Sequence, residues 1–328
     1  MIWLNNLFVA SRLFICCASY LLHLFLREWS KVVKVIQDLA QHHGFVGSLF
    51  QKFVSDNFAQ FKLSDHQIEF YHRYGYLSGI KLLETAQADH LLEELSSIQN
   101  SNHPSNSLFY EFNSNESHDP SKVLFHALGA WRTTPGFHDI LWNPAFTVPA
   151  SQLLGGSVRF WHDQLFCKPA RHGGVVAWHQ DYSYWTRTKP MAHLTCWIAL
   201  EDANVDNGCL HYVPKSHRWD LLPVTGLAGD MEAIRAVLSP SQCAEFTRHI
   251  PIELKKGYAT FHHPLLVHGS FENKTERQRR ATVINVFRDG VCSDSNDQLL
   301  HGVPSIPKGH PMTGTFFPLL LDSNDVSS

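Results

Sequence analysis

The sequence predicts a mainly β fold, a sandwich or barrel of short strands with flanking helices. After Pro149 the chain consists largely of short runs rich in β-branched and aromatic residues, separated by turns. The composition is 44% hydrophobic and 17% charged, which is enough for a sizeable packed core and argues against global disorder. The expected strands are Val158–Cys167, Val175–His179, Leu194–Leu200, Cys209–Val213, Tyr258–Phe261, Leu265–His268 and Ala281–Phe287.

Helices are expected before these strands. Ser64 and Gln67 have the spacing of a capping box, which predicts a helix that begins here and runs through Tyr74. The stretch Asn100–Ser121 is rich in Ser and Asn and is expected to be a loop. A second helix before this loop would present four apolar residues on one face: Leu91, Leu92, Leu95 and Ile98.

One long segment, residues 218–250, interrupts the strand pattern. It contains a helix start at Ser239-Pro240, with Gln242 three residues after the cap. An insertion of this length between strands is typical of a lid over a pocket.

The N-terminal segment, residues 1–43, is unlike the rest of the chain. Ile2–Leu26 is largely apolar and has no acidic residue. Three interpretations stay open: a membrane anchor, a targeting peptide for an organelle, or an amphipathic helix on the protein or a membrane surface. We expect an intracellular protein. Association with a membrane or targeting to an organelle through residues 2–26 is one interpretation of this segment, and an ordinary helix packed on the domain is the other. We further expect a linker or helix at 44–62, the main domain at 63–290 and a C-terminal extension at 291–328.

Charge and cysteine content exclude several classes of protein. The net charge is −3 and the pI about 6.7, whereas a nucleic-acid-binding protein usually has a strongly basic face. The seven cysteines contain no C-x-x-C pair and are odd in number. This argues against a disulfide scaffold and a zinc ribbon, and favours a reducing compartment. We therefore expect no nucleic-acid partner.

The sequence His179-Gln180-Asp181 is a candidate metal site. Residues i and i+2 of a strand point to the same face, so this imidazole and this carboxylate can reach one metal ion. A third ligand is expected from His268, with His262 and His263 as alternatives that spacing does not exclude. Two histidines and one carboxylate form the facial triad of non-haem Fe(II) oxygenases, which leaves positions for a co-substrate and O₂.

Arg279 follows His268 by eleven residues and begins an expected strand. An arginine offers a bidentate fork to a carboxylate, so it is a candidate partner for a dicarboxylate co-substrate. Arg277 and Arg280 are alternatives by sequence alone.

From about Leu63 to Phe287 the chain resembles the phytanoyl-CoA dioxygenase family, which belongs to the 2-oxoglutarate oxygenases with a double-stranded β-helix (jelly-roll, cupin-like) core. Three blocks carry the resemblance. The first is Lys168-Pro169, Gly173-Gly174 and His179-Gln180-Asp181. The second is Trp197 to Asp202, Asn207 to Leu210 and Val213-Pro214-Lys215-Ser216-His217. The third is His268-Gly269-Ser270, Asn273 and Arg279-Arg280-Ala281. Lys215 stands where the family usually has glycine, so this turn avoids positive φ or tolerates a small strain.

The resemblance implies the composition of the site. His179, Asp181 and His268 would be the catalytic centre and bind Fe(II). The 2-oxoglutarate would contact Arg279 and Ser270, with Trp197 and Thr195 on the neighbouring strand, and Gln164 and Lys122 approaching it from earlier segments. Tyr182, Tyr184 and Trp185 are candidates for the wall of a substrate pocket.

The resemblance also implies a reaction. A dioxygenase of this kind consumes O₂ and 2-oxoglutarate, with ascorbate as a supporting reductant, and hydroxylates a small apolar or amphipathic substrate while releasing succinate and CO₂. Relatives that halogenate have a small residue in place of the carboxylate, so Asp181 favours hydroxylation. The alternative is a catalytically silent relative that acts as a metal-binding or ligand-binding sensor or scaffold.

Overall fold

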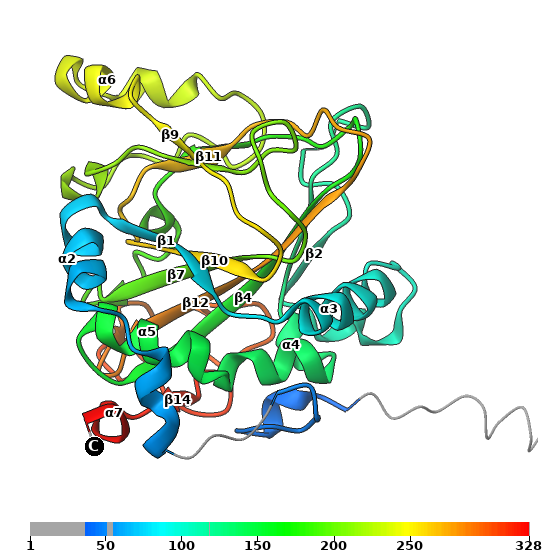
Figure 1. Cartoon of the computed structure of the whole chain (residues 1–328), viewed down its shortest axis with the longest axis vertical. Coiled ribbons are helices and arrows are strands. Elements are labelled where there is room, and N and C mark those ends of the chain that lie inside the picture. Colours follow the sequence, from blue (N-terminus) through cyan, green and yellow to red (C-terminus); the bar gives the residue numbers. More distant parts are fainter. Residues whose placement is uncertain (1–36, 51–54, 118, 328) are drawn as a thin grey trace, which may run out of the picture. The chain divides into compact units, whose positions relative to one another are not determined.

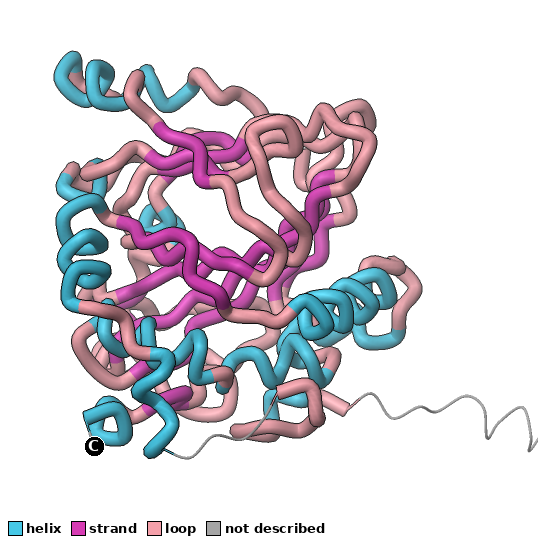
Figure 2. The backbone as a smooth tube through the Cα atoms, in the orientation of Figure 1, coloured by secondary structure: helices cyan, strands magenta, loops and turns pink. Residues whose placement is uncertain are grey.

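The computed structural model describes residues 37–50, 55–117 and 119–327, and residues 38–328 form one compact unit. Two antiparallel sheets face each other in this unit, and Figure 2 shows the strands gathered in these two layers. The large sheet has the order β1 (Tyr76–Lys81), β10 (Tyr258–His262), β7 (His193–Ala199), β12 (Arg279–Arg288), β4 (Val158–Lys168), β3 (Phe125–Leu128) and β2 (Glu111–Asn113), and β14 (Leu319–Leu321) also pairs with β4. The small sheet has the order β5 (Val176–His179), β11 (His268–Ser270), β8 (Leu210–Tyr212) and β9 (Ile250–Ile252). The expected double-stranded β-helix is confirmed.

Helices cover the outer face of the large sheet. In Figure 1, α3, α4 and α5 lie on the side of this sheet opposite to β9 and β11. The α-helices are α2 (Asp65–Tyr74), α3 (Thr85–Ile98), α4 (Pro135–Asp139), α5 (Pro144–Leu154), α6 (Pro240–Phe246) and α7 (Ser323–Ser327). The 3-10 turns are η1 (Leu39–Gln41), η2 (Ser55–Phe61), η3 (Pro104–Leu108), η4 (Ala130–Arg132), η5 (Ile140–Trp142), η6 (Asp181–Tyr184), η7 (Ser216–Arg218) and η8 (Ala233–Val237). A two-stranded ribbon joins β6 (Thr188–Lys189) to β13 (Cys292–Ser293).

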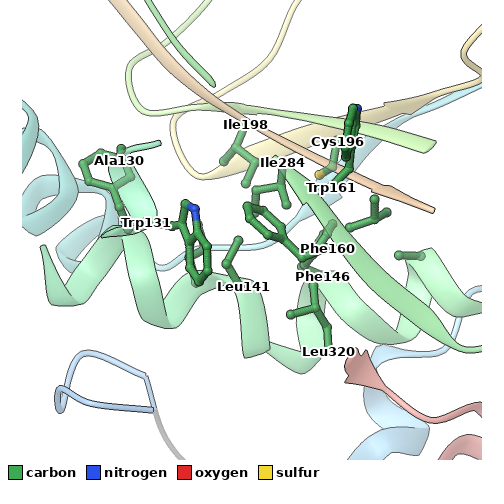
Figure 3. Packing of buried hydrophobic residues seen from close by; sticks show 14 of the residues in the cluster. Ala130, Trp131, Leu141, Phe146, Phe160, Trp161, Cys196, Ile198, Ile284 and Leu320 are labelled. Carbon is green, nitrogen blue, oxygen red and sulfur yellow. The ribbon is translucent and has the colours of Figure 1, made fainter. Parts of the chain in front are cut away.

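The large sheet has two different faces because successive side chains of a strand alternate. On β7, Cys196 and Ile198 belong to the main hydrophobic core between sheet and helices, which Figure 3 shows with Trp131, Phe146 and Ile284. The intervening residues of β7, Thr195 and Trp197, point the other way and line a cavity between the two sheets. The main core therefore supports the sheet from outside, and the inner face is available for a site.

The predicted helix starts are confirmed. A capping box joins Ser64 and Gln67 at the start of α2, and a second one joins Ser239 and Gln242 at the start of α6. In each case the serine side chain accepts from a backbone N–H that lacks a partner within the helix. Lys215 has a φ of 73°, so its turn adopts the left-handed conformation and tolerates the strain.

Two expectations about strands are wrong. The stretch Leu265–His268 is not a strand: Leu266 N–H donates to the His263 carbonyl in a turn, and the strand β11 begins at His268 rather than ending there. The expected loop Asn100–Ser121 contains the edge strand β2, which pairs with β3. This strand is only three residues long and lies between Ser-rich and Asn-rich stretches, so the composition of the segment did not predict it.

The terminal segments of the compact unit pack against its core. Most of the N-terminal segment 1–43, including residues 2–26, lies outside the described residues. From Asp38 onward the chain contacts the domain: the Asp38 carboxylate pairs with the guanidinium of Arg132, and Leu39 and Ala40 are buried. At the other end, β14 joins the large sheet. Within the described ranges, no helix has the length and apolar character needed to cross a membrane.

Deleting residues 1–43 should destabilise the domain more than deleting residues 1–36, by about 2 kcal/mol. The longer deletion removes Asp38, and a mostly buried Arg132 loses its charge partner. Urea unfolding of the two truncated proteins measures this difference. Asp38→Ala in the full chain should reproduce most of it. Equal stability of the two truncated proteins would show that Asp38 contributes nothing to the fold.

Candidate active site

The pairing of β5 with β11 brings two histidines together at one end of the small sheet. His179 and His268 lie directly opposite each other in this pairing, and their ring centroids are 4.2 Å apart. Each imidazole places its Nδ1 against the carbonyl two residues earlier, Ala177 for His179 and Leu266 for His268, at 2.8 and 2.9 Å. A carbonyl only accepts, so Nδ1 carries the hydrogen in both rings and Nε2 keeps a lone pair.

Asp181 completes a group of three metal-ligating side chains. Its Oδ1 lies 3.5 Å from His179 Nε2 and 3.6 Å from His268 Nε2. The potential ligand atoms of the three residues all lie within 4.8 Å of one another, and no other such group occurs among the described residues. Burial lowers the pKa of His268 well below its usual value, and the neighbouring His179 lowers it further. The imidazole is therefore neutral, as metal binding requires.

The other oxygen of Asp181 is held by residues of the large sheet. Oδ2 accepts from the Thr195 hydroxyl at 2.6 Å and lies 3.0 Å from His262 Nε2. The His262 Nδ1 in turn lies 2.9 Å from the Tyr212 hydroxyl, and both residues are buried. Asp181 therefore offers one oxygen, Oδ1, to a metal, while Oδ2 is fixed. Thr195 is thus brought to the carboxylate of Asp181, and His262 orients that carboxylate.

His262→Ala should weaken metal binding about 10-fold to 100-fold, the usual cost of removing a residue that orients a metal ligand. His263→Ala should change metal affinity by less than about two-fold, because the His263 ring only accepts from the Leu265 N–H of its own turn. Competition for Co(II) with a chromophoric chelator measures both affinities. Similar values for the two variants would mean that His262 does not orient Asp181.

Arg279 lies at the inner face of the large sheet, in the same cavity as the three ligands. It is 1% exposed, and its guanidinium packs on the ring of Trp197 with 5.4 Å from Cζ to the ring centroid. Burial lowers its pKa to about 10, so the group is charged at neutral pH. The Nε atom is buried with no hydrogen-bond partner among the described residues, and Nη1 reaches only the Phe166 carbonyl at 3.5 Å. A buried cation of this kind calls for an anionic ligand.

Ser270 and Lys168 lie beside this arginine. Ser270 lines the cavity, and its hydroxyl oxygen accepts from Lys168 Nζ at 2.7 Å. Lys168 is fully buried and also donates to the carbonyls of Ser270 and Phe271. Since the Ser270 oxygen is an acceptor for Lys168, its own hydrogen can be donated to a ligand. The role of Lys168 was missed, although its place in a buried strand, in alternation with Gln164 and Phe166, was a signal for it.

The other expected co-substrate residues are placed differently. Gln164 lines the cavity on the same face of β4 as Phe166. Lys122 does not line it: its side chain is 45% exposed and pairs with Glu272 at 2.7 Å. A surface ion pair satisfies Lys122, while Lys168 places a buried amino group beside Ser270.

A second cavity of about 300 Å³ adjoins the first and shares His179, Asp181 and Gln164 with it. Of the three aromatic residues expected in its wall, Tyr184 and Trp185 line it. Tyr182 does not, because its hydroxyl donates to the Thr188 carbonyl within the core. The insertion 218–250 contributes Leu227 to the lining.

Residues 71–281 match the phytanoyl-CoA dioxygenase (PhyH) family along their whole length. This chain belongs to the phytanoyl-CoA dioxygenase family. The family is one of non-haem iron, 2-oxoglutarate-dependent dioxygenases, which is the class of enzyme that the triad and the buried arginine indicate.

Curated relatives share this family. A phytanoyl-CoA dioxygenase from Arabidopsis thaliana is 28% identical over 269 residues, which are 72% of this chain and 92% of the relative. A probable phytanoyl-CoA dioxygenase from Caenorhabditis elegans is 32% identical over 162 residues, which are 48% of this chain and 50% of the relative. Among solved structures, the epimerase SnoN in complex with Fe³⁺, alpha ketoglutarate and nogalamycin RO matches with a TM-score of 0.64 at 22% identity, covering 80% of this chain and 99% of that chain. This structural similarity supports the fold.

The residues present fit the cofactor and co-substrate of the phytanoyl-CoA dioxygenase family. Two imidazole nitrogens and one carboxylate oxygen are a donor set suited to Fe(II). The buried Arg279, with an unpartnered Nε, fits the distal carboxylate of 2-oxoglutarate. Neither fit depends on a side chain that would have to leave another partner.

Proposed function

We propose that this chain hydroxylates a small apolar or amphipathic organic molecule with Fe(II), 2-oxoglutarate and O₂, and that succinate and CO₂ are the co-products. One oxygen atom of O₂ would enter the substrate and the other would enter succinate. The observation that carries the proposal is the position of Asp181 Oδ1, 3.5 and 3.6 Å from two histidine nitrogens. The same cavity contains Arg279, whose Nε has no hydrogen-bond partner among the described residues.

Each residue would have a distinct role. The Nε2 atoms of His179 and His268 and Oδ1 of Asp181 would hold the iron, which supplies O₂ activation and oxidative decarboxylation of the 2-oxo acid. Arg279 and the Ser270 hydroxyl would bind the distal carboxylate of 2-oxoglutarate, and Trp197 would keep the guanidinium in place by packing on it. Thr195 would act on Asp181 rather than on the co-substrate, because its hydroxyl donates to Oδ2.

The test is the conversion of 2-oxoglutarate to succinate by purified, iron-loaded protein without added substrate, with ascorbate present. A rate that depends on iron and on 2-oxoglutarate supports the oxygenase. A protein that binds both and produces no succinate, alone or with any substrate in a mass-spectrometric screen for gain of one oxygen, would instead be a silent sensor or scaffold. The complete triad and the unpaired arginine argue against that second function, because a scaffold has no physical need for both.

A further inference from the structure

The 300 Å³ cavity beside the metal ligands contains polar groups that the iron and 2-oxoglutarate chemistry does not use. Its lining includes Glu111 on β2 and Glu116 just after that strand, together with His126 on β3. These three residues lie outside the strands that carry the triad. What they recognise bears on the substrate, since the same cavity reaches His179 and Asp181.

Glu116 and His126 form one hydrogen-bonded unit. The Glu116 Oε2 accepts from Asn113 Nδ2 at 2.6 Å and lies 3.4 Å from His126 Nδ1. The His126 ring is stacked on Phe166, with centroids 4.5 Å apart and an interplanar angle of 16°, which fixes its orientation. Facing a carboxylate, Nδ1 carries a hydrogen, and Nε2 is the ring nitrogen left to contact a ligand.

This Nε2 atom is left without a partner. His126 is 4% exposed, and Nε2 has no hydrogen-bond partner among the described residues. A buried polar atom without a partner costs free energy, which a ligand that forms a hydrogen bond with it recovers. The unpartnered nitrogen of His126 therefore favours a bound molecule with a hydrogen-bonding head group, next to the negative charge of Glu116.

The charge of the cavity favours a cationic donor. Apart from the metal ligand Asp181, the lining carries two carboxylates, those of Glu111 and Glu116. Arg187 is the one lysine or arginine in the lining within the described part of the chain, and its guanidinium is tied to the carbonyls of Gln298 and Leu299 at 2.7 and 3.2 Å. Burial lowers the pKa of the lining residue His162 to about 3, so this ring adds no positive charge.

Aromatic side chains join the acidic end of the cavity to the metal end. Tyr184 lines the cavity together with Glu116 and Asp181. Its ring is 5.9 Å from that of His179, and Trp185 and Trp161 also line the cavity. Aromatic faces attract cations and pack against apolar chains.

We propose that this cavity takes a small amphiphile with a cationic amine, held by Glu116 and His126, whose apolar part extends along the aromatic wall toward the metal ligands. The proposal rests on the proposed oxygenase function and names its substrate class. It disfavours a coenzyme A ester, because phosphate groups need a cluster of basic side chains and would meet carboxylates here.

Four probes with the same eight-carbon chain and different head groups test the proposal: octylamine, octanol, octanoate and octanoyl-CoA. Binding to the iron-loaded protein with 2-oxoglutarate, without oxygen, is measured by calorimetry. We expect octylamine to bind at least about ten-fold tighter than the other three, the effect of one charge-assisted hydrogen bond. The proposal is overturned if octanol, octanoate or octanoyl-CoA binds as tightly as octylamine. It is also overturned if octylamine shows no measurable binding.

Glu116→Gln keeps the shape of the side chain and removes its charge. It should weaken octylamine binding about ten-fold and change octanol binding by less than about two-fold. Glu111→Gln is a second variant at the same cavity, and the exposed Glu93→Gln on α3 is the matched control that should change neither affinity. An unchanged preference for the amine in both cavity variants overturns the assignment of these carboxylates.

The same samples separate this proposal from the proposed function. Titration of the protein with iron and then with 2-oxoglutarate reports on the metal centre, independently of the amine. If both bind and the amine does not, the substrate class is wrong, while the metal and co-substrate site on which the proposed oxygenase depends is unaffected. If neither binds, the proposed function itself fails.

Discussion

His179→Ala, Asp181→Ala and His268→Ala should each lose metal binding and turnover. Every variant removes one of the three donors that converge on a single point, with Asp181 Oδ1 within 3.6 Å of both Nε2 atoms. The loss of metal affinity should exceed about 100-fold, the upper end of the cost of losing a residue that merely orients a ligand. Iron content after dialysis and succinate formation measure the two effects.

His263→Ala is the control for these three variants. Its ring accepts from the Leu265 N–H and does not line the cavity of the triad. Circular dichroism of each variant shows whether it has folded. Full activity of His268→Ala, combined with loss of activity in His263→Ala, would mean that the third ligand is a different histidine.

Arg279→Ala should raise the KM for 2-oxoglutarate roughly 100-fold, equivalent to about 3 kcal/mol, with a smaller effect on kcat. A dicarboxylate that enters this cavity would leave its distal carboxylate buried without a positive charge. Arg279 has no carboxylate partner among the described residues that would compete for it. Steady-state kinetics at saturating iron measure the change.

Arg280→Ala is the matched control, because neighbouring residues of a strand point to opposite faces. Arg280 lies on the outer side of the sheet and pairs with Glu201 at 2.8 Å. Its loss should change the KM for 2-oxoglutarate by less than about two-fold, as expected for a partly exposed ion pair. A similar rise in KM for both variants would contradict binding of the co-substrate by Arg279.

The sequence was sufficient to predict those parts of the site that depend on local periodicity. The i, i+2 spacing of His179 and Asp181 does bring both side chains to one point, although only His179 belongs to β5 and Asp181 begins the 3-10 turn η6. Strand alternation separates Arg279 from Arg280. Capping boxes located the starts of α2 and α6, since the signal lies within four consecutive residues. The choice of His268 over His262 needed the family resemblance, because both are buried histidines of similar context.

Contacts between segments that are far apart in the sequence could not be predicted from local patterns. His262 orients Asp181 across 81 positions of the chain, and Lys168 contacts Ser270 across 102. Lys122 was expected at the co-substrate from alignment alone, and only the paired register of β3, β4 and β12 shows that Lys168 is the lysine on the inner face. Glu111 and Glu116 were not predicted as cavity residues, because they lie in a polar stretch that was expected to be a loop.

The two cavities differ in whether strands or connecting segments form their walls. The metal ligands and Arg279 belong to strands of the two sheets or to the residues directly after them, where a shift of one residue would turn every side chain to the opposite face. Much of the wall of the larger cavity comes from connecting segments: the stretch around Glu116, Leu227 of the insertion, and Leu299 and Leu300 of the C-terminal part. Connecting segments accept insertions and substitutions that strands do not. A protein built this way can acquire a new substrate by changes in three loops, while the chemistry of its iron centre stays as it is.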